Sequence, residues 1–183
     1  MKTLYIADKI CVAKRIAIVG WPGAGKSTFA KKLGDKLNRE VFSIDKIRFD
    51  KTGKKVQDSE YDKSHKKLLS RKTWIIEGNE ANRLIDKRLN TADLILFLDS
   101  NRLLSLSNCL SRIFKIKIGS EKRQGVHSRN SLNNVINQSR HILTVAPKSM
   151  AKIKALLKNH QAKTYFIKSR KQANEIVRNL EEK

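Results

Sequence analysis

The sequence is poor in cysteine and in acidic residues, and no run approaches the roughly eighteen consecutive apolar residues of a membrane span. Cys11 and Cys109 lie far apart and belong to no paired motif. We expect both to be small core residues in a reducing cytoplasm, which argues against a disulfide or a cysteine metal site. The histidines also lack metal-ligand spacing. Asp8 interrupts the apolar stretch near the start, so a signal peptide is not expected.

The charge balance is strongly basic, because 40 Lys and Arg residues face only 17 Asp and Glu residues, a formal net charge of +23. No acidic residue lies between Glu121 and Glu175, whereas many lysines and arginines do. A field of this sign attracts nucleotides, nucleic acids or acidic membranes. The alternative is a lysine-rich surface that follows from an AT-rich genome, since charge alone does not identify a partner.

A glycine-rich segment from Gly20 to Thr28 gives the strongest functional indication. Its two outer glycines, with four residues between them, precede Lys and Ser, which is the pattern of a phosphate-binding loop. A short apolar run at 15–19 precedes the segment, and apolar residues at helical spacing follow it. Strand, glycine loop and helix is the context that this motif requires. The alternative is a glycine- and proline-rich turn that binds no ligand.

Each residue type in this segment has a physical role in binding a triphosphate. Glycines let successive backbone N–H groups point at one anion, and the following helix adds the positive end of its dipole. Lys26 places a charge at the β/γ-phosphate oxygens, and Ser27 offers a hydroxyl to Mg²⁺. The expected ATP-binding residues are Gly20, Pro22, Gly23, Ala24, Gly25, Lys26, Ser27 and Thr28.

Strand-like runs alternate with helical patterns along the chain. The expected strands are 15–19, 40–45, 73–77, 93–99 and 162–167. The expected helices are 27–38, 60–70, 103–114, 131–144, 148–159 and 171–180. Such alternation, with near-continuous apolar strands, predicts an α/β fold with a parallel, doubly wound sheet in three layers. Sheets of this kind bind ligands at the carboxyl ends of their strands.

Two segments stand outside this alternation. Residues 1–14 form an N-terminal extension before a domain at 15–183, and Thr3–Ala7 is either a short edge strand or a disordered lead-in. Residues 115–128 contain glycines among many basic residues, and we expect them to form a mobile lid that closes over ATP.

Charged and polar side chains follow the second and third expected strands. Asp45 ends the second strand and Arg48 lies one helical turn later, so both can face one cleft. Asp45 can accept a hydrogen bond from a substrate hydroxyl or act as a base, and Arg48 can hold an acceptor phosphate. Glu77, at the end of the third strand, can orient Mg²⁺ through water, and Asn79 can bind substrate. The alternatives are a helix cap, a surface cation and an ordinary strand-to-turn junction.

Basic residues near the expected lid complete the candidate site. Arg112, Lys122 and Arg123 flank or occupy the lid loop, where they can meet the charge that develops during phosphoryl transfer. Arg140 is a further candidate from the far side of the site. Taken one at a time these side chains fit a solvated surface better, but as a group we expect some of them to engage phosphate.

Together these motifs resemble a known family. The glycine-proline-glycine loop is similar to that of small P-loop kinases such as adenylate kinase. The segments at 44–47, 74–79 and 88–93 extend the resemblance to the adenylate-kinase-related proteins called bacterial topology modulation proteins, over 15–180 of the chain. The resemblance implies a sheet of strand order 2-3-1-4-5, an acceptor-binding helical segment after the second strand and a lid after the fourth.

The resemblance also implies roles for individual residues. Lys26 and Ser27 match the residues that bind ATP·Mg²⁺. Asp45 and Arg48 match residues of the acceptor side. Arg112 and Arg123 match residues of the lid. The Asp-Gly-Phe-Pro-Arg segment of adenylate kinases is here Glu-Gly-Asn-Glu-Ala at 77–81. It lacks the proline and the close arginine, which argues against AMP as the acceptor.

These observations lead to two hypotheses from different classes. The first is a cytoplasmic, ATP- and Mg²⁺-dependent kinase that phosphorylates a small phosphate- or hydroxyl-bearing acceptor, most simply a nucleotide-like one. The alternative is a basic nucleic-acid-binding protein in which ATP binding is regulatory or vestigial. A GTPase is disfavoured because the chain contains no Asn-Lys-x-Asp guanine-reading motif.

Overall fold

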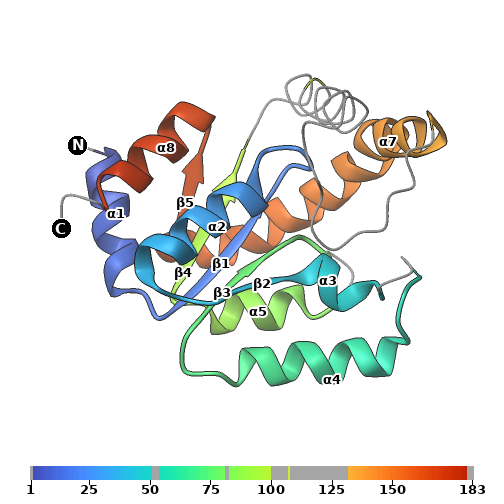
Figure 1. Ribbon diagram of the computed structural model, residues 1–183, viewed down its shortest axis with the longest axis horizontal. Coiled ribbons are helices and arrows are strands. Elements are labelled where there is room, and N and C mark those ends of the chain that lie inside the picture. The colour runs from blue at the N-terminus through green and yellow to red at the C-terminus, as the bar shows by residue number, and fades with distance from the viewer. Residues whose placement is uncertain (1, 51–53, 81–82, 100–106, 108–131, 181–183) are drawn as a thin grey trace.

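The computed structural model describes residues 2–50, 54–80, 83–99, 107 and 132–180, and in 132–143 only the backbone is described (Figure 1). The strands are β1 (Arg15–Gly20), β2 (Val41–Ser43), β3 (Trp74–Glu77), β4 (Leu94–Leu98) and β5 (Thr164–Ile167). The α-helices are α1 (Lys2–Val12), α2 (Lys26–Leu37), α3 (Ile44–Arg48), α4 (Asp58–Leu69), α5 (Ile85–Thr91), α7 (Leu132–Leu157) and α8 (Arg170–Arg178). A 3₁₀ helix, η1 (Lys158–Lys163), precedes β5.

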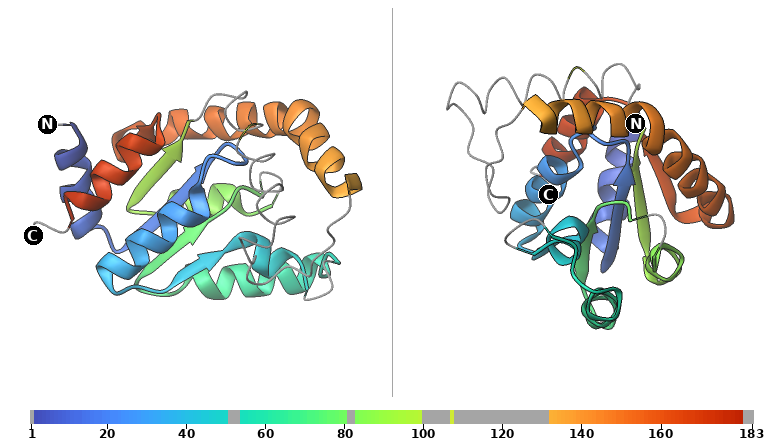
Figure 2. Two further views of the ribbon diagram at one scale, coloured as in Figure 1. Left: turned by 45° about the horizontal axis from the view of Figure 1, so that its top comes forward. Right: turned by 90° about the vertical axis from the view of Figure 1, so that its right-hand side faces the viewer.

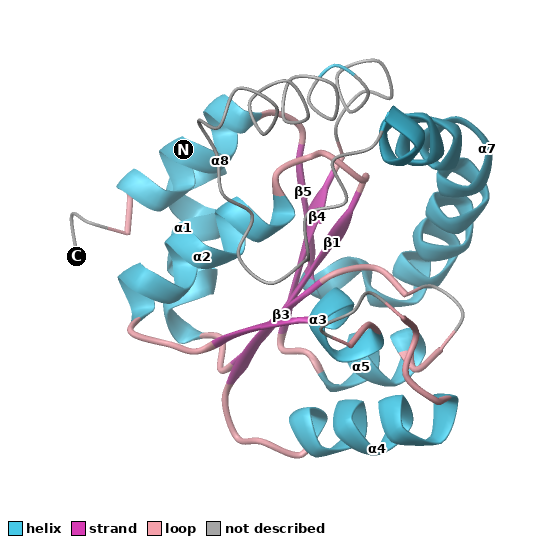
Figure 3. Cartoon of the chain, turned by 45° about the vertical axis from the view of Figure 1, so that its right-hand side comes forward, coloured by secondary structure: helices cyan, strands magenta, loops and turns pink. Residues whose placement is uncertain are grey.

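The five strands form one parallel sheet in the order β2-β3-β1-β4-β5. This confirms the predicted α/β class, the parallel pairing and the predicted strand order. Helices cover both faces of the sheet, with α1, α2 and α8 on one side and α4, α5 and α7 on the other (Figure 3). β1 lies at the centre of the sheet, so the loop that follows it opens at the middle of the carboxyl edge.

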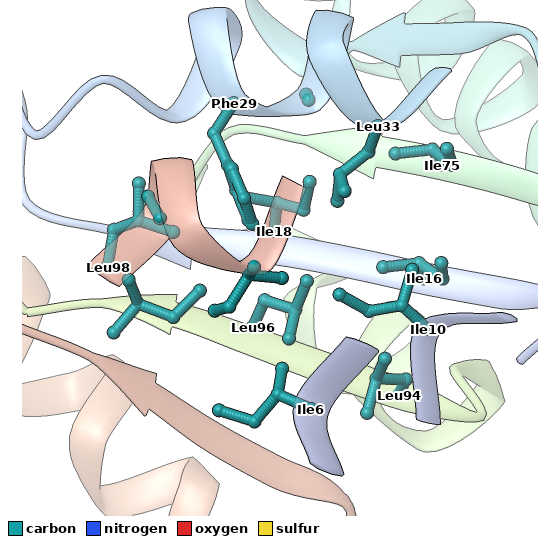
Figure 4. Close-up of a cluster of buried hydrophobic side chains, with 14 of the residues drawn as sticks. Ile6, Ile10, Ile16, Ile18, Phe29, Leu33, Ile75, Leu94, Leu96 and Leu98 are labelled. Carbon is teal, nitrogen blue, oxygen red and sulfur yellow. The ribbon is translucent and has the colours of Figure 1, made fainter. Parts of the chain in front are cut away.

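Alternating side chains of the strands supply the two halves of the core. Ile16 and Ile18 of β1 face α1, α2 and α8, and they pack with apolar residues of those helices (Figure 4). Ala17 and Val19 face the opposite layer, where α4, α5 and α7 contribute the apolar partners. Because both faces are covered, the strands read as continuous apolar runs, which is why they could be recognised in the sequence.

Thr3–Ala7 is helical, so both alternatives considered for it, an edge strand and a disordered lead-in, are wrong. The segment belongs to α1, where Ile6, Ala7 and Ile10 recur on one helical face and are fully buried. α1 packs against α8, and the two helices lie side by side (Figure 2). The Thr3 hydroxyl donates a hydrogen bond of 3.0 Å to Glu175 of α8. The domain boundary at residue 15 stays a prediction.

Three further differences concern element boundaries. The second strand ends at Ser43, and the next residues begin α3. Helix α5 had no sequence prediction. The two helices expected at 131–144 and 148–159 are one helix, α7, which continues through Pro147. The helix is held on the sheet by a stripe of buried residues, which are Ala146, Met150, Ile153 and Leu157. This packing offsets the backbone hydrogen bond that is lost at Pro147.

We expect Ile10→Ala to lower the free energy of unfolding by roughly 2–5 kcal/mol, because it opens a cavity where α1 packs on the sheet. Val12→Ala is the matched control, since Val12 lies in the same helix and is 76% exposed. That control should change stability by about 0.5 kcal/mol or less. Urea unfolding measures both variants, and equal small losses would show that α1 adds little to the core.

Candidate active site

The loop between β1 and α2 has a backbone that depends on glycine. Gly20, Gly23 and Gly25 have φ of 140°, 75° and 89°, in the region that favours glycine. A β-carbon at Gly20 would lie 2.3 Å from the carbonyl oxygen of Leu98 in β4, so no side chain fits there. A β-carbon at Gly25 would meet nothing within 4 Å. The loop is thus tightly packed at its first glycine and open above the start of α2.

The beginning of α2 is suited to an anion. Gly25 precedes the helix in a left-handed conformation, and no side chain caps it. The Ser27 and Thr28 side chains are exposed. Lys26 Nζ donates to the carbonyl oxygens of Gly20 (3.1 Å) and Trp21 (2.9 Å), so its ammonium group lies over the loop. Positive helix end, open space and ammonium group together fit the phosphates of a nucleotide.

Asn79 lies against this loop, although the sequence suggested a substrate contact for it. The Gly20 N–H donates to Asn79 Oδ1 (3.1 Å), and Asn79 Nδ2 donates to the Gly20 carbonyl oxygen (2.9 Å). One side-chain amide therefore satisfies both backbone groups of the first loop glycine. This contact joins the segment after β3 to the loop after β1.

Glu77, the candidate magnesium residue, is buried at the end of β3 and pairs in register with Ile18 of β1. This places its backbone one strand away from the phosphate-binding loop. Among the described residues there is no cluster of three or more histidine, cysteine or acidic side chains that could hold a metal by itself. Mg²⁺ in nucleotide sites is usually held by one or two protein groups together with phosphate oxygens.

Arg88 of α5 is a site residue to which the sequence analysis gave no role. It is fully buried, and its Nη2 donates to the carbonyl oxygens of Gly78 (2.8 Å) and Asn79 (3.0 Å). Burial lowers the pKa of Arg88 to about 10, so the guanidinium stays charged at neutral pH. The signal was present in the sequence, because Arg88 shares helical spacing with the apolar residues Ile85 and Leu89.

Asp45 and Arg48 both belong to α3 but have different surroundings. Asp45 lies in the first turn and is exposed. Arg48 is 6% exposed, and its Nη1 lies 2.7 Å from a carboxylate oxygen of Asp58 in α4. Its Nε lies 3.7 Å from Glu80, and its guanidinium is 5.0 Å from the centre of the Tyr61 ring. Arg48 is therefore already ion-paired, whereas the Asp45 carboxylate is open to solvent.

Tyr61 and His65 are buried beside Arg48, and sequence reasoning assigned neither to the site. Their rings meet edge to face with centroids 5.4 Å apart. Burial, with a smaller contribution from Arg88, lowers the pKa of His65 to about 4, so the ring is neutral at pH 7. Burial raises the pKa of Tyr61 to about 12. This aromatic pair is an uncharged part of the core beneath α3.

The expected lid residues cannot be placed relative to this site. Arg112, Lys122, Arg123 and the lid at 115–128 lie outside the described residues. Arg140 lies in the described backbone of α7, but its side chain is not described. Their roles stay predictions.

Comparisons with known proteins support the fold. No family model matches the chain. A 45-residue segment is 47% identical to a shikimate kinase of Sulfurihydrogenibium sp. (strain YO3AOP1), and it spans 25% of this chain and about a quarter (27%) of that protein. The crystal structure of shikimate kinase from Bacteroides thetaiotaomicron matches with a TM-score of 0.52 at 15% identity. That match covers 93% of this chain and 98% of the other.

The chain therefore has an α/β fold like that of shikimate kinase, with the strand order 2-3-1-4-5. The identity in the structural match is low, so it shows the fold alone. Among the described residues, no helix is both long enough and apolar enough to cross a membrane.

We expect His65 to make the protein sensitive to mild acid. Its pKa of about 4 in the folded state is below the ordinary 6.5, so the unfolded chain binds the proton more readily between these values. This part of the stability is complete above pH 6.5 and is lost as the pH falls towards 4. From pH 7 to 4.5 the loss should be roughly 2 kcal/mol.

His65→Phe, which keeps an aromatic ring beside Tyr61, should remove most of this dependence in urea unfolding measured across that pH range. His160→Gln is the control, because His160 is only half-buried and lies in η1. A wild-type protein and a His65→Phe variant with the same pH slope would contradict the assignment.

Proposed function

We propose that the protein is an ATP-dependent kinase that transfers a phosphoryl group to a small acceptor. The observation that supports this most directly is the glycine-built loop at the end of the central strand, with Lys26 lying over it and open space at Gly25. The two proteins compared above are each named shikimate kinase, a name that describes phosphorylation of a small molecule. Membership of the topology modulation group is a finer proposal that rests on the sequence motifs alone.

The residues around the loop divide the work of phosphoryl transfer. Lys26 and the loop amides would neutralise the β/γ-phosphate oxygens, while Ser27 would bind Mg²⁺ and Glu77 would orient it. Bound Mg²⁺ supplies further positive charge for the transferred group. Phosphoryl transfer needs little covalent chemistry from the protein, so positioning and charge are the main requirements. In this proposal Arg112 and Arg123 add charge from the lid, and Arg140 binds substrate from the far side of the site.

The residues of α3 favour an acceptor hydroxyl bound by Asp45 over an acceptor phosphate bound by Arg48. Asp45 is exposed, so its carboxylate is free to orient an acceptor hydroxyl or to take its proton. Arg48 is paired with Asp58 at 2.7 Å, so an acceptor phosphate would have to compete with that carboxylate. We therefore place the acceptor hydroxyl at Asp45, with Arg48 shaping the wall of the site. A nucleotide-like acceptor satisfies this arrangement.

We expect Lys26→Ala to reduce ATP-dependent phosphorylation by roughly 10²-fold or more, because the charge at the β/γ-phosphate oxygens is lost. Lys31→Ala is the matched control, since Lys31 is an exposed lysine of the same helix. Circular dichroism and thermal unfolding should show that both variants fold. Turnover in Lys26→Ala at the wild-type rate would refute the role of Lys26.

The substrate should be sought by ADP release with ATP and Mg²⁺. The panel should contain nucleosides, nucleoside monophosphates, shikimate, sugars and oligonucleotides with a 5′-hydroxyl. A response that Lys26→Ala abolishes and Lys31→Ala preserves would identify the acceptor class.

A second candidate function is nucleic-acid binding, and one surface favours it. α2 and α8 contact each other on one face of the sheet, and Lys32 Nζ of α2 donates to Asn174 of α8 (2.9 Å). Exposed basic residues collect on these two helices: Lys31, Lys32, Lys36, Arg170, Lys171 and Arg178. A polyanion is the natural partner of such a face.

If this face binds nucleic acid, duplex DNA should be retarded at about 50 mM salt, and the affinity should fall steeply as salt rises, because bound counterions are released. Replacing Lys32 and Lys36 by Gln should lower the salt slope, whereas Lys26→Ala should not. A flat salt dependence, or no retardation at low salt, would remove this candidate.

A further inference from the structure

We infer that Arg88 and Asn79 act together as a positioning device, here called the Arg88–Asn79 strut, which fixes the first glycine of the phosphate-binding loop. The inference rests on the proposed function, since it assumes that this loop binds ATP. It gives both residues a role in nucleotide affinity without placing either in contact with the nucleotide.

The first step is the contact between Asn79 and Gly20. The amide of Asn79 accepts from the Gly20 N–H and donates to the Gly20 carbonyl oxygen, at 3.1 and 2.9 Å. The same carbonyl oxygen accepts from Lys26 Nζ at 3.1 Å. Asn79 therefore orients a backbone group that is also a partner of the ammonium ion. A change at Asn79 is transmitted to Lys26 through one oxygen atom.

The second step is that packing alone does not fix the backbone position of Gly20. Gly20 has a φ of 140° and no room for a side chain, because the carbonyl of Leu98 lies where its β-carbon would be. Glycine is also the residue whose backbone is least restricted. Tight packing on the β4 side therefore leaves the other side of Gly20 to be held by hydrogen bonds, and Asn79 supplies them.

The third step is that Arg88 holds the backbone of Asn79. Its Nη2 donates to two successive carbonyl oxygens, those of Gly78 and Asn79, at 2.8 and 3.0 Å. Buried backbone carbonyls need a donor, and Arg88 supplies one to both of these. Gly78 has a φ of 120°, and a β-carbon there would lie 2.9 Å from that of Ile44, so this turn is also strained for any other residue.

The free-energy cost of burying the charged Arg88 side chain indicates that this residue does more than fill space in the core. The side chain is completely buried, and its Nε and Nη1 have no hydrogen-bond partner among the described residues. Apolar residues of similar size often stabilise a core as well as a buried ion does. A buried guanidinium is retained more readily where it specifies one arrangement of polar groups, which here is the turn that presents Asn79 to the loop.

The test compares Arg88→Met and Asn79→Ala with the control Arg83→Met. Arg83 belongs to the same connecting segment, but its guanidinium pairs with Asp58 and Asp62 of α4 and not with the loop. Affinity for ATP with Mg²⁺ is measured by calorimetry, and hydrogen exchange reports the Gly20 amide without nucleotide. Urea unfolding gives the stability of each variant.

We expect Arg88→Met and Asn79→Ala each to weaken ATP binding about tenfold, and the double variant to lose little more than either, because both act through one device. Exchange of the Gly20 amide should accelerate in both. Arg88→Lys should recover part of the affinity, since an ammonium group can donate to the same two carbonyls. Arg83→Met should match the wild-type protein in affinity and exchange.

Two results would overturn the inference. One is that Arg88→Met loses stability while the folded variant binds ATP as the wild-type protein does, which would make Arg88 merely structural. The other is unchanged exchange at Gly20 in both strut variants. If instead the wild-type protein binds no ATP, the proposed function fails, and exchange at Gly20 still decides whether the strut holds the loop.

Discussion

The close approach of Gly20 to β4 is the constraint on which the candidate site depends. Because the backbone of β1 runs against Leu98 without an intervening side chain, the chain must turn sharply at the middle of the sheet. That turn places the loop, the start of α2 and the end of β3 at one edge. The position of the proposed nucleotide site at this edge thus follows from strand order and from a missing β-carbon, before any charged residue is considered.

Much of the fold was predictable because its strands are buried on both faces and its phosphate loop has a strict pattern. Parallel pairing and α2 followed from such local signals, whereas the strand order was implied by the resemblance to small P-loop kinases. Elements that depend on tertiary contacts did not: α1 is helical because Ile6 and Ile10 meet the sheet and α8, and α7 passes through Pro147 because its apolar stripe stays packed. Pattern alone does not contain these partners.

The site divides in the same way. Lys26 and the loop glycines were recognisable since their spacing is that of a phosphate-binding motif. Arg88, Tyr61 and His65 belong to no such motif, and their importance comes from a burial that only tertiary packing creates. Acidic residues are scarce in this chain, yet Asp58, Asp62 and Glu80 gather around Arg48 and Arg83. The surroundings of α3 and α4 are therefore rich in ion pairs, whereas the ammonium group of Lys26 donates to backbone carbonyl oxygens of the loop.

The packing of α1 on α8 has a consequence for biosynthesis. Thr3 and Glu175 are separated by 172 positions, so the ribosome exposes the apolar face of α1 long before α8 is made. Until then Ile6 and Ile10 have only part of their covering layer. Closing a loop of this length costs conformational entropy, so the contact between α1 and α8 forms late. The nascent chain should therefore expose these apolar side chains until α8 is made, and exposed apolar surface of this kind favours aggregation unless chaperones cover it.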